Sequence, residues 1–240
     1  MPTLNQKTIK TYDTIAKGFS DSHFDPNFWK KEFEIFQKLI SGKPPHKGAP
    51  VGGISPPHQD FLCGGKKIID IGCGAGRDAI LFKKAKFDYT GIDASSKMLK
   101  EARKRVPRGK PPHQKFWCGG TFIVMDFYNL TFPPGTFDGF WASASLLHIP
   151  KNRIKKVLQD IAHIIKTDGI GFISLKEKRE MDHGIIQENK YGSHIERFFA
   201  FYTDTESQKV LRESGFDVIK NHTLKKDDTN WLCYFVKKHG

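Results

Sequence analysis

The chain has 240 residues, of which 38% are hydrophobic and 12% aromatic, and this composition excludes an intrinsically disordered protein. The length is typical of one domain with a sizeable core. A net charge of +13 would suit an anionic partner such as RNA, yet the lysines are spread along the whole chain instead of forming one block. The charge therefore predicts a solvated basic surface rather than a nucleic-acid site.

The sequence also argues against a membrane protein and against a disulfide-stabilised protein. No apolar run has the length of a transmembrane helix, and the first residues, MPTLNQKTIKTYD, carry charges where a signal peptide needs an apolar core. The four cysteines (Cys63, Cys73, Cys118 and Cys233) are too few and too scattered for a disulfide framework. We therefore expect a cytoplasmic location, reduced thiols, no membrane partner and no metal.

The N-terminal segment, residues 1–42, is expected to form a helical cap. Residues 8–19 carry apolar side chains at helical spacing, and Asp25-Pro26 resembles the cap and first position of a second helix. The two apolar stripes are interpreted mainly as core, with the alternative that Tyr12 and Phe19 close over a bound cofactor. The stripes comprise Ile9, Tyr12, Ala16 and Phe19 in the first helix and Trp29, Phe33, Phe36 and Ile40 in the second.

The sequence IIDIGCGAGRDA at 68–79 predicts a buried strand, a glycine loop and a helix start. Gly72, Gly74 and Gly76 alternate along the loop and let the backbone approach a ligand closely. The G-x-G-x-G spacing differs from the G-x-G-x-x-G of dinucleotide sites, and Asp70 stands just before the first glycine. Both details favour S-adenosylmethionine over NAD, although a tight strand-to-helix turn can need glycine for structure alone.

Two further predicted strands also end on acids. The strand at 87–93 ends at Asp93, which can reach a ribose or simply cap the next helix, at 96–106, which carries Met98. The strand at 121–126 ends at Asp126, which can accept a hydrogen bond from an exocyclic amine while Phe127 stacks on a base.

The second half continues the alternation of strands and helices. A fourth strand in 137–149 supplies small residues, including Ala142 and Ser143, beneath a ligand, and a helix after Pro150 leads to a fifth strand, GIGFISLKEK. This order predicts a parallel sheet covered on both faces. Residues 178–203 lack this alternation of strands and helices and are expected to form a substrate-side cap. A capping box then begins a last helix, and β-rich runs at 216–223 and 230–237 flank a turn.

These motifs in this order resemble the class I S-adenosylmethionine-dependent methyltransferases over nearly the whole chain. The motifs are IIDIGCGAGRDA, GIDASSKML, VMDFYNL followed by TFPPGTFDGFW, and ASASLLHIP leading to IIKTDGIGFISLKEK. The resemblance implies a single α/β domain, with a Rossmann-like, seven-stranded, mostly parallel sheet of order 3-2-1-4-5-7-6 and helices on both faces.

The resemblance also implies roles for individual residues. Asp70, Gly72, Gly74 and Gly76 would hold the methionine end of S-adenosylmethionine, and Asp93 would bind the ribose hydroxyls. Asp126 would bind the adenine amine, with Met98 or Phe127 against the ring. Ala142 and Ser143 would lie at the methyl group.

The acceptor and its chemistry are less defined. His148 is the candidate base, with a packed core histidine as the alternative, and Arg197 and Tyr202 either bind the acceptor or serve the sheet edge and core. The aromatic run 198–202 favours a small-molecule acceptor. An RNA methyltransferase acting on tRNA or rRNA is the alternative, followed by a nucleotide-binding protein without methyl transfer.

Two segments depart from the family pattern and are interpreted as loop insertions. Residues 43–65 and 110–120 share the sequence PPHQ-x-F-x-CGG, and each precedes a strand start on the edge expected to lie opposite the cofactor. Each can be encoded by an in-frame DNA palindrome, which gene sequencing tests. A rival interpretation places a zinc site on His58, Cys63, His113 and Cys118.

Overall fold

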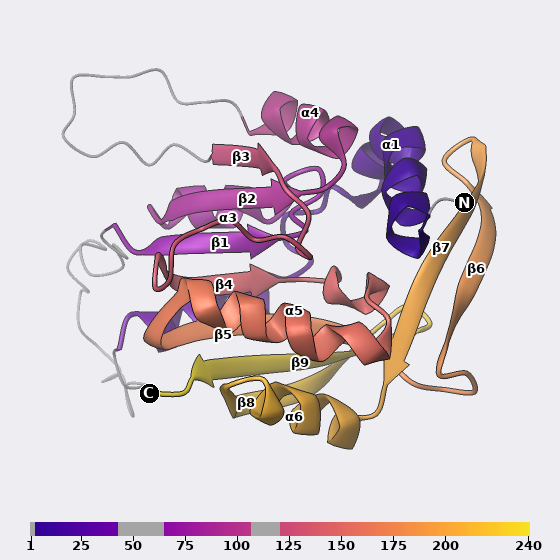
Figure 1. Ribbon diagram of the computed structural model, residues 1–240. Helices are drawn as coiled ribbons and strands as arrows, with labels where there is room; N and C mark the ends of the chain where they lie inside the picture. Colours follow the sequence, from indigo (N-terminus) through magenta and orange to yellow (C-terminus); the bar gives the residue numbers. More distant parts are fainter. Residues whose placement is uncertain (1–2, 43–64, 107–120) are drawn as a thin grey trace, which may run out of the picture.

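A computed structural model describes residues 3–42, 65–106 and 121–240 of the chain. Its sheet contains five parallel strands in the order β3-β2-β1-β4-β5 (Figure 1). Each strand coincides with an apolar run predicted from the sequence. The strands are β1 Lys67–Ile71, β2 Asp88–Asp93, β3 Thr121–Val124, β4 Phe137–Ala142 and β5 Ile165–Glu177.

The C-terminal pair completes the family topology. β9 (Thr229–Lys238) pairs antiparallel with β5, and β8 (Phe216–Lys226) pairs with β9 at the edge. When these two strands are counted as sixth and seventh, the order is the expected 3-2-1-4-5-7-6 with an antiparallel seventh strand. The Rossmann-like fold is confirmed, whereas the count of seven strands is wrong, because the described residues form a sheet of nine.

The two additional strands form a hairpin within the segment expected to be an irregular cap. β6 (His183–Lys190) and β7 (Ser193–Tyr202) pair antiparallel around Tyr191 and Gly192, whose φ values of 57° and 74° match a two-residue hairpin turn. The sequence pattern does not indicate β6, because the segment HGIIQENK is mostly polar and has no fully buried residue. The apolar pattern of the hairpin lies in β7 instead, which buries Phe198, Phe199 and Ala200.

The sheet forks at the end of β5. β4 pairs with β5 only as far as Ala142 and Ile173, and beyond that point β7 takes the vacated edge, pairing Phe201 with Lys176. β9 continues along the other edge of β5 to the same Lys176. The hairpin therefore extends away from the sheet just beyond the carboxyl end of β4 (Figure 1).

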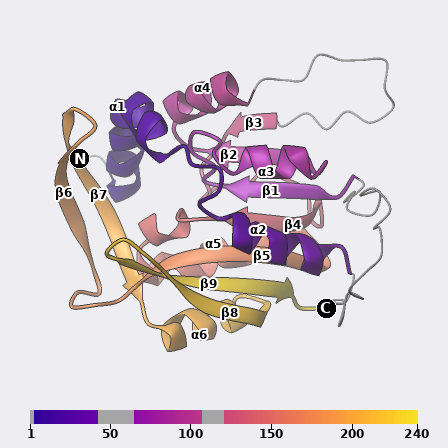
Figure 2. The same ribbon diagram turned by 180° about the vertical axis from the view of Figure 1, so that it is seen from behind.

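Helices cover both faces of the sheet, as predicted. α5 (Lys151–Ile164) and α6 (Asp204–Glu213) bury their apolar stripes in one core cluster. α2 (Lys30–Ile40), α3 (Ala79–Lys84) and α4 (Ser96–Arg105) contribute to a second, aromatic-rich cluster on the opposite face (Figure 2). α1 (Leu4–His23) instead lies across the carboxyl edge of the strands, between α4 and the hairpin.

The second helix begins later than predicted. Asp25 does not cap it; the Asp25 carbonyl and carboxylate accept hydrogen bonds from the N–H groups of Phe28 and Asn27, which forms a turn, and the helix starts at Lys30. None of the described helices is long and apolar enough to cross a membrane.

The insertion segments 43–65 and 110–120, with the suggested zinc ligands, lie outside the described residues except for Gly65. The strand starts that follow them, Lys67 and Thr121, are at the edge opposite the carboxyl ends of the parallel strands. The predicted position of these strand starts is therefore correct, whereas the zinc interpretation stays a prediction.

Candidate functional site

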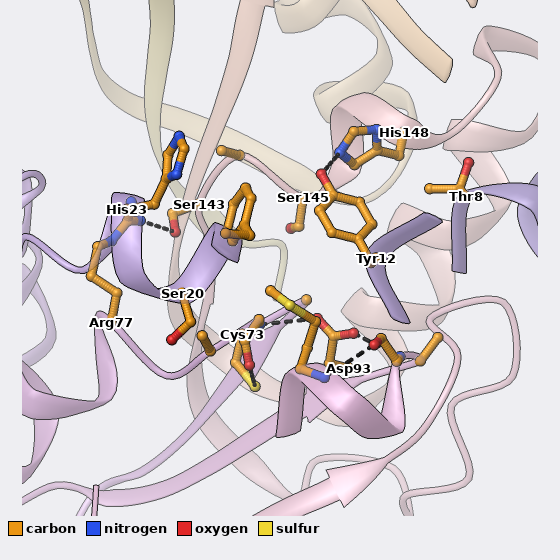
Figure 3. A pocket seen from close by; sticks show the side chains of 18 of the residues that line it. Thr8, Tyr12, Ser20, His23, Cys73, Arg77, Asp93, Ser143, Ser145 and His148 are labelled. Atoms are coloured by element: carbon orange, nitrogen blue, oxygen red, sulfur yellow. Dashed lines mark hydrogen bonds between the residues drawn. The ribbon is translucent and has the colours of Figure 1, made fainter. Parts of the chain in front are cut away.

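A pocket of about 940 Å³, including the part open to solvent, lies at the carboxyl edge of the parallel strands. It is bounded by the loops after β1, β2 and β4 on one side and by α1 on the other (Figure 3). Its position at the carboxyl ends of the parallel strands is where open α/β sheets bind their ligands. The polar and aromatic residues of the lining include Asn5, Thr8, Tyr12, Phe19, Ser20, His23, Arg77, Asp78, Asp93, Ser95, Phe127, Ser143, Ser145 and His148.

The glycine loop forms the base of the pocket. Gly72 and Gly74 have φ values of +75° and +54°, which other residues rarely adopt. A Cβ at Gly72 would come within 2.5 Å of the Ser145 Cβ, so the chain after β4 packs directly on the loop backbone. Gly76 lies outside the pocket lining, and a Cβ there would meet the Cβ of Ala102 in α4 at 3.0 Å. The third glycine therefore serves packing, whereas the first two shape the pocket.

Asp93 enters the pocket from the end of β2. Its carboxylate accepts hydrogen bonds from the N–H of Gly74, 2.9 Å away, and from the N–H of Ser95, 2.8 Å away. Burial raises the pKa of Asp93 to about 6, against the lowering effect of these two N–H donors. The acid thus connects the glycine loop to the start of α4, and it can accept further hydrogen bonds from a bound polyol.

A second acid, Asp78, anchors a network beside the loop. Its carboxylate pairs with the Arg77 guanidinium (2.6 Å) and accepts hydrogen bonds from Ser143 Oγ (2.6 Å) and Trp141 Nε1 (2.9 Å). Although burial opposes ionisation, the neighbouring Arg77 charge holds the pKa of Asp78 below its ordinary value. Arg77 is thereby fixed in the pocket wall, where its cationic face can meet an anionic group.

Tyr12 and His148 face one another across the upper part of the pocket (Figure 3), with the Tyr12 hydroxyl 2.8 Å from His148 Nε2. His148 Nδ1 lies 2.7 Å from the Phe198 carbonyl in β7, and because a carbonyl only accepts, Nδ1 carries the proton. In the neutral ring Nε2 must then accept from the Tyr12 hydroxyl. Burial lowers the pKa of His148 to about 4, so the ring is neutral at physiological pH.

Two buried hydroxyls in the pocket wall have no partner among the described residues. Ser20 Oγ in α1 and Ser145 Oγ after β4 are both buried and unpaired, although both residues line the pocket. Buried polar groups without partners are rare in native proteins, so these two hydroxyls point to a polar ligand. Together with the glycine backbone and Asp93, they fit the cofactor implied by the sequence.

The comparison with protein families agrees with this geometry. Residues 68–169 match the family described as a methyltransferase domain, and the match runs from β1 through the glycine loop and β4 into β5. This segment belongs to the methyltransferase-domain family. The matched segment contains Asp93 and His148 but ends before the β6–β7 hairpin.

Individual relatives are distant. The chain is 25% identical over 196 residues to the methyltransferase phqN of Penicillium fellutanum, covering 76% of this chain and 57% of that protein. It is 30% identical over 126 residues to a 2-methyl-6-phytyl-1,4-hydroquinone methyltransferase of Synechocystis sp., covering 52% and 35%. The chain therefore spans only about a third to three fifths of the length of these two curated relatives.

A solved structure shows the same fold. The Burkholderia thailandensis 1,6-didemethyltoxoflavin-N1-methyltransferase, with bound 1,6-didemethyltoxoflavin and S-adenosylhomocysteine, superposes with a TM-score of 0.63. The two proteins are 16% identical, and the superposition covers 100% of this chain and 92% of that one. The superposed region therefore includes α1 and the β6–β7 hairpin.

The structure brings seven of the residues proposed from the sequence into the pocket wall: Gly72, Gly74, Asp93, Met98, Phe127, Ser143 and His148. Asp70 lies beneath the loop instead, where its carboxylate accepts a 2.7 Å hydrogen bond from the Tyr89 hydroxyl. Asp126 is beside the pocket, and it accepts hydrogen bonds from Asn5 Nδ2 at 2.5 Å and from the N–H of Tyr128. Ala142 is fully buried in the core below Ser143.

The two candidate acceptor-binding residues lie behind the lining. The Arg197 guanidinium pairs with Glu188 across the hairpin and stacks on Phe199. Burial raises the pKa of Tyr12, and the Arg197 charge opposes this effect without overcoming it. The Tyr202 ring faces the Lys151 ammonium, and its buried hydroxyl has no partner among the described residues. Arg197 therefore lies close enough to Tyr12 for its charge to be felt there, and Tyr202 belongs to the core near α5.

Sequence reasoning missed most of the contribution from α1. Asn5, Thr8, Ser20 and His23 all line the pocket, on the same helix as the predicted Tyr12 and Phe19. Several of these residues are spaced by three or four positions in the sequence, but polar residues do not register in an apolar stripe. Arg77 and Asp78 were also missed, because they follow the last glycine in a region interpreted as a helix start.

Proposed function

We propose that this protein transfers the methyl group of S-adenosylmethionine to a small-molecule acceptor by in-line displacement. The observation that carries the proposal is the pocket itself, in which the Gly72–Gly74 backbone, Asp93 and two unpaired serine hydroxyls converge. The match of residues 68–169 to a methyltransferase domain and the fold that the chain shares with a solved methyltransferase support this activity. The sulfonium supplies a reactive methyl and a good leaving group, so the protein's main task is to orient the acceptor.

For cofactor binding, we propose Asp93 for the ribose hydroxyls, and Met98 with Phe127 as apolar contacts of the base. Gly72 and Gly74 leave room for the methionine portion, and Arg77 offers its charge to the carboxylate. Asp70 and Asp126 would not touch the cofactor directly. Asp70 would support the glycine loop from beneath, and Asp126 would hold Asn5 in the pocket wall. Gly76 and Ala142 keep structural roles in this proposal.

For catalysis, we propose that His148 and Tyr12 position the acceptor and take its proton. The neutral His148 ring has its Nε2 lone pair directed at the Tyr12 hydroxyl, so a proton released by an acceptor bound at Tyr12 can pass to Nε2. Arg197 would stabilise the negative charge that develops on the phenol oxygen during this transfer. Tyr202 would support the hairpin from the core.

The acceptor is proposed to be small because the pocket is covered by α1 and narrowed by aromatic side chains. Tyr12, Phe19, His23 and Phe24 form the α1 side of the wall, and the hairpin stands next to it. A structured RNA would need an open, basic rim. We keep a cytoplasmic location and a metal-independent reaction as parts of this proposal.

The test is a methyl-transfer screen with radiolabelled S-adenosylmethionine, comparing a panel of small phenols, quinols and amines with bulk tRNA and rRNA. Product on a small molecule, lost in Asp93→Ala, is expected. Label only in RNA would select the alternative acceptor class. Failure to bind S-adenosylmethionine in calorimetry would reject the enzyme itself.

A further inference from the structure

Three metal-ligand side chains that the proposed reaction does not use lie together on the face of the sheet covered by α2. They are Glu32 in α2, His222 in β8 and Cys233 in β9, and their ligand atoms all lie within 4.8 Å of one another. None of the three lines the pocket. Within residues 3–42, 65–106 and 121–240, this is the one group of three such side chains that the structure contains.

The three side chains are held by rigid elements. His222 and Cys233 are directly opposite each other in the antiparallel β8–β9 ladder, and such cross-strand partners project from the same face of a sheet. Glu32 is in the first turn of α2, which packs on that face, and its Oε1 lies 2.9 Å from His222 Nε2. The arrangement is therefore set by the backbone of three elements rather than by a flexible loop.

The surroundings make a carboxylate costly here. Glu32 is 2% exposed and Cys233 is fully buried, next to an aromatic cluster that contains Trp29, Phe36 and Phe235. A buried carboxylate needs a positive partner, and His222 supplies one only when it is protonated.

The thiol pays a similar penalty when it ionises. Cys233 is fully buried, and its Sγ lies within 4.8 Å of the Glu32 carboxylate, so a thiolate there would face a neighbouring negative charge. A divalent cation would reverse both penalties, because it neutralises the carboxylate and stabilises the thiolate.

We propose that Glu32, His222 and Cys233 bind a zinc ion, with a water molecule as the fourth ligand. An oxygen, a nitrogen and a sulfur ligand suit Zn²⁺ better than a hard cation. The His222 side chain is 27% exposed, which leaves a route from solvent for the ion and the water. Tetrahedral bonds of about 2 Å place ligand atoms roughly 3.3 Å apart, so the 2.9 Å contact between Glu32 and His222 needs to open by less than ~1 Å.

The ion would fasten the N-terminal part of the chain to its C-terminal strands. In the sequence, all five parallel strands lie between Glu32 and the other two ligands. No short motif of closely spaced ligands therefore reveals the site. This explains why the sequence predicted no metal, and the site is independent of the His58, Cys63, His113 and Cys118 interpretation. Its role would be structural, since it lies on the α2 face and outside the pocket.

Cobalt spectroscopy on the full-length chain tests the proposal. After removal of metal with a chelator, we expect one equivalent of Co²⁺ to produce a thiolate-to-cobalt charge-transfer band, which Zn²⁺ abolishes. The triple variant C63A/C73A/C118A keeps Cys233 as its only cysteine and should retain the band. Cys233→Ala should lose it and bind Zn²⁺ at least about tenfold more weakly, as should His222→Gln and Glu32→Gln.

The matched control is Cys73→Ala, which removes a thiol in the pocket and should keep the band unchanged. No band in the triple variant, or a band that persists in Cys233→Ala, would overturn the proposal. If Cys233→Ala does not fold, the triple variant and His222→Gln still decide the question, because both leave the buried thiol in place.

Discussion

In its proposed role, Asp93 combines two demands that normally oppose each other: it is withdrawn from water, and it would need to be ionised to accept hydrogen bonds from both ribose hydroxyls. The N–H groups of Gly74 and Ser95 hold the carboxylate in place. Burial nevertheless raises its pKa to about 6, which brings its titration close to physiological pH. Cofactor binding should therefore report on the protonation of this one residue.

We predict that Asp93→Asn weakens S-adenosylmethionine binding about tenfold or more, since unsatisfied buried donors cost roughly 1–3 kcal/mol. In the parent protein, binding requires the ionised form, so affinity should be constant above the pKa. It should fall as the pH drops through about 6, approaching tenfold per pH unit. Calorimetry between about pH 8 and about pH 5 measures both effects.

The asparagine side chain cannot titrate, so Asp93→Asn also serves as a control and should show a flat profile over that range. An equally steep profile in this variant would place the titrating group elsewhere. Unchanged affinity in the variant at neutral pH would remove Asp93 from the cofactor site.

Among the elements, α1 depends on contacts that a sequence pattern does not display. Its Asp13 accepts a hydrogen bond from Ser95 Oγ at 2.6 Å, which ties it to the start of α4. On its other side, a Cβ at Gly18 would come within 2.9 Å of the Cβ of Tyr191, at the tip of the hairpin. The helix is thus clamped between two elements that lie far from it in sequence.

We predict that Gly18→Val separates α1 from the hairpin. Replacing a helical glycine normally favours the helix by up to about 1 kcal/mol, so a loss of order in α1 would come from the steric clash and not from propensity. The measurement is amide hydrogen exchange along α1, combined with the affinity for S-adenosylmethionine. Faster exchange and weaker binding are expected.

Lys17→Val, at the exposed neighbouring position, is the matched control, because it places the same side chain on the same helix without meeting the hairpin. Its exchange and affinity should equal those of the parent. Equal behaviour of the two variants would show that the close approach of Gly18 and Tyr191 does not hold α1.

The elements that could be predicted from the sequence are those whose own residues show which positions are buried and where the element ends. β1, β2 and the glycine loop are recognisable because β-branched runs end near Asp70 and Asp93. The capping box of Thr203 and Glu206 was also visible, and the structure has it. The hairpin was missed because β6 is mostly polar and has no apolar pattern. Arg77 was missed because its role depends on its partner Asp78, whose hydrogen bonds come from Ser143 and Trp141, far along the chain.

At the scale of the whole molecule, the main architectural fact is where the strands that follow the two repeated segments begin. Both precede strands whose starts, Lys67 and Thr121, lie at the edge opposite the glycine loop. The described lining of the pocket instead follows the carboxyl ends of the strands.

We predict that a chain lacking residues 43–65 and 110–120 folds and binds S-adenosylmethionine with similar affinity. The change in stability should be limited to loop-closure entropy, about 0.6 kcal/mol for each halving of loop length. Thermal melting and calorimetry of the shortened chain provide the measurement. Metal analysis of both forms should give the same zinc content, because Glu32, His222 and Cys233 are retained.

Collapse of the shortened chain, or loss of zinc with the deletion, would contradict this view. It would show that the segments stabilise the domain, and it would favour His58, Cys63, His113 and Cys118 as ligands. Deleting residues 43–65 alone and residues 110–120 alone separates the contributions of the two segments.

The fork at the end of β5 has an evolutionary consequence. Because β7 joins the sheet only where β4 has already ended, changes in the hairpin need not alter the pairing of the strands that carry the glycine loop and Asp93. The hairpin reaches the pocket indirectly, through the Phe198 carbonyl on His148 and through Tyr191 against α1. A lineage with this architecture can therefore tune the surroundings of His148 by mutations in one contiguous segment, and a hairpin grafted from a relative should leave S-adenosylmethionine affinity intact when it keeps Tyr191 and Phe198.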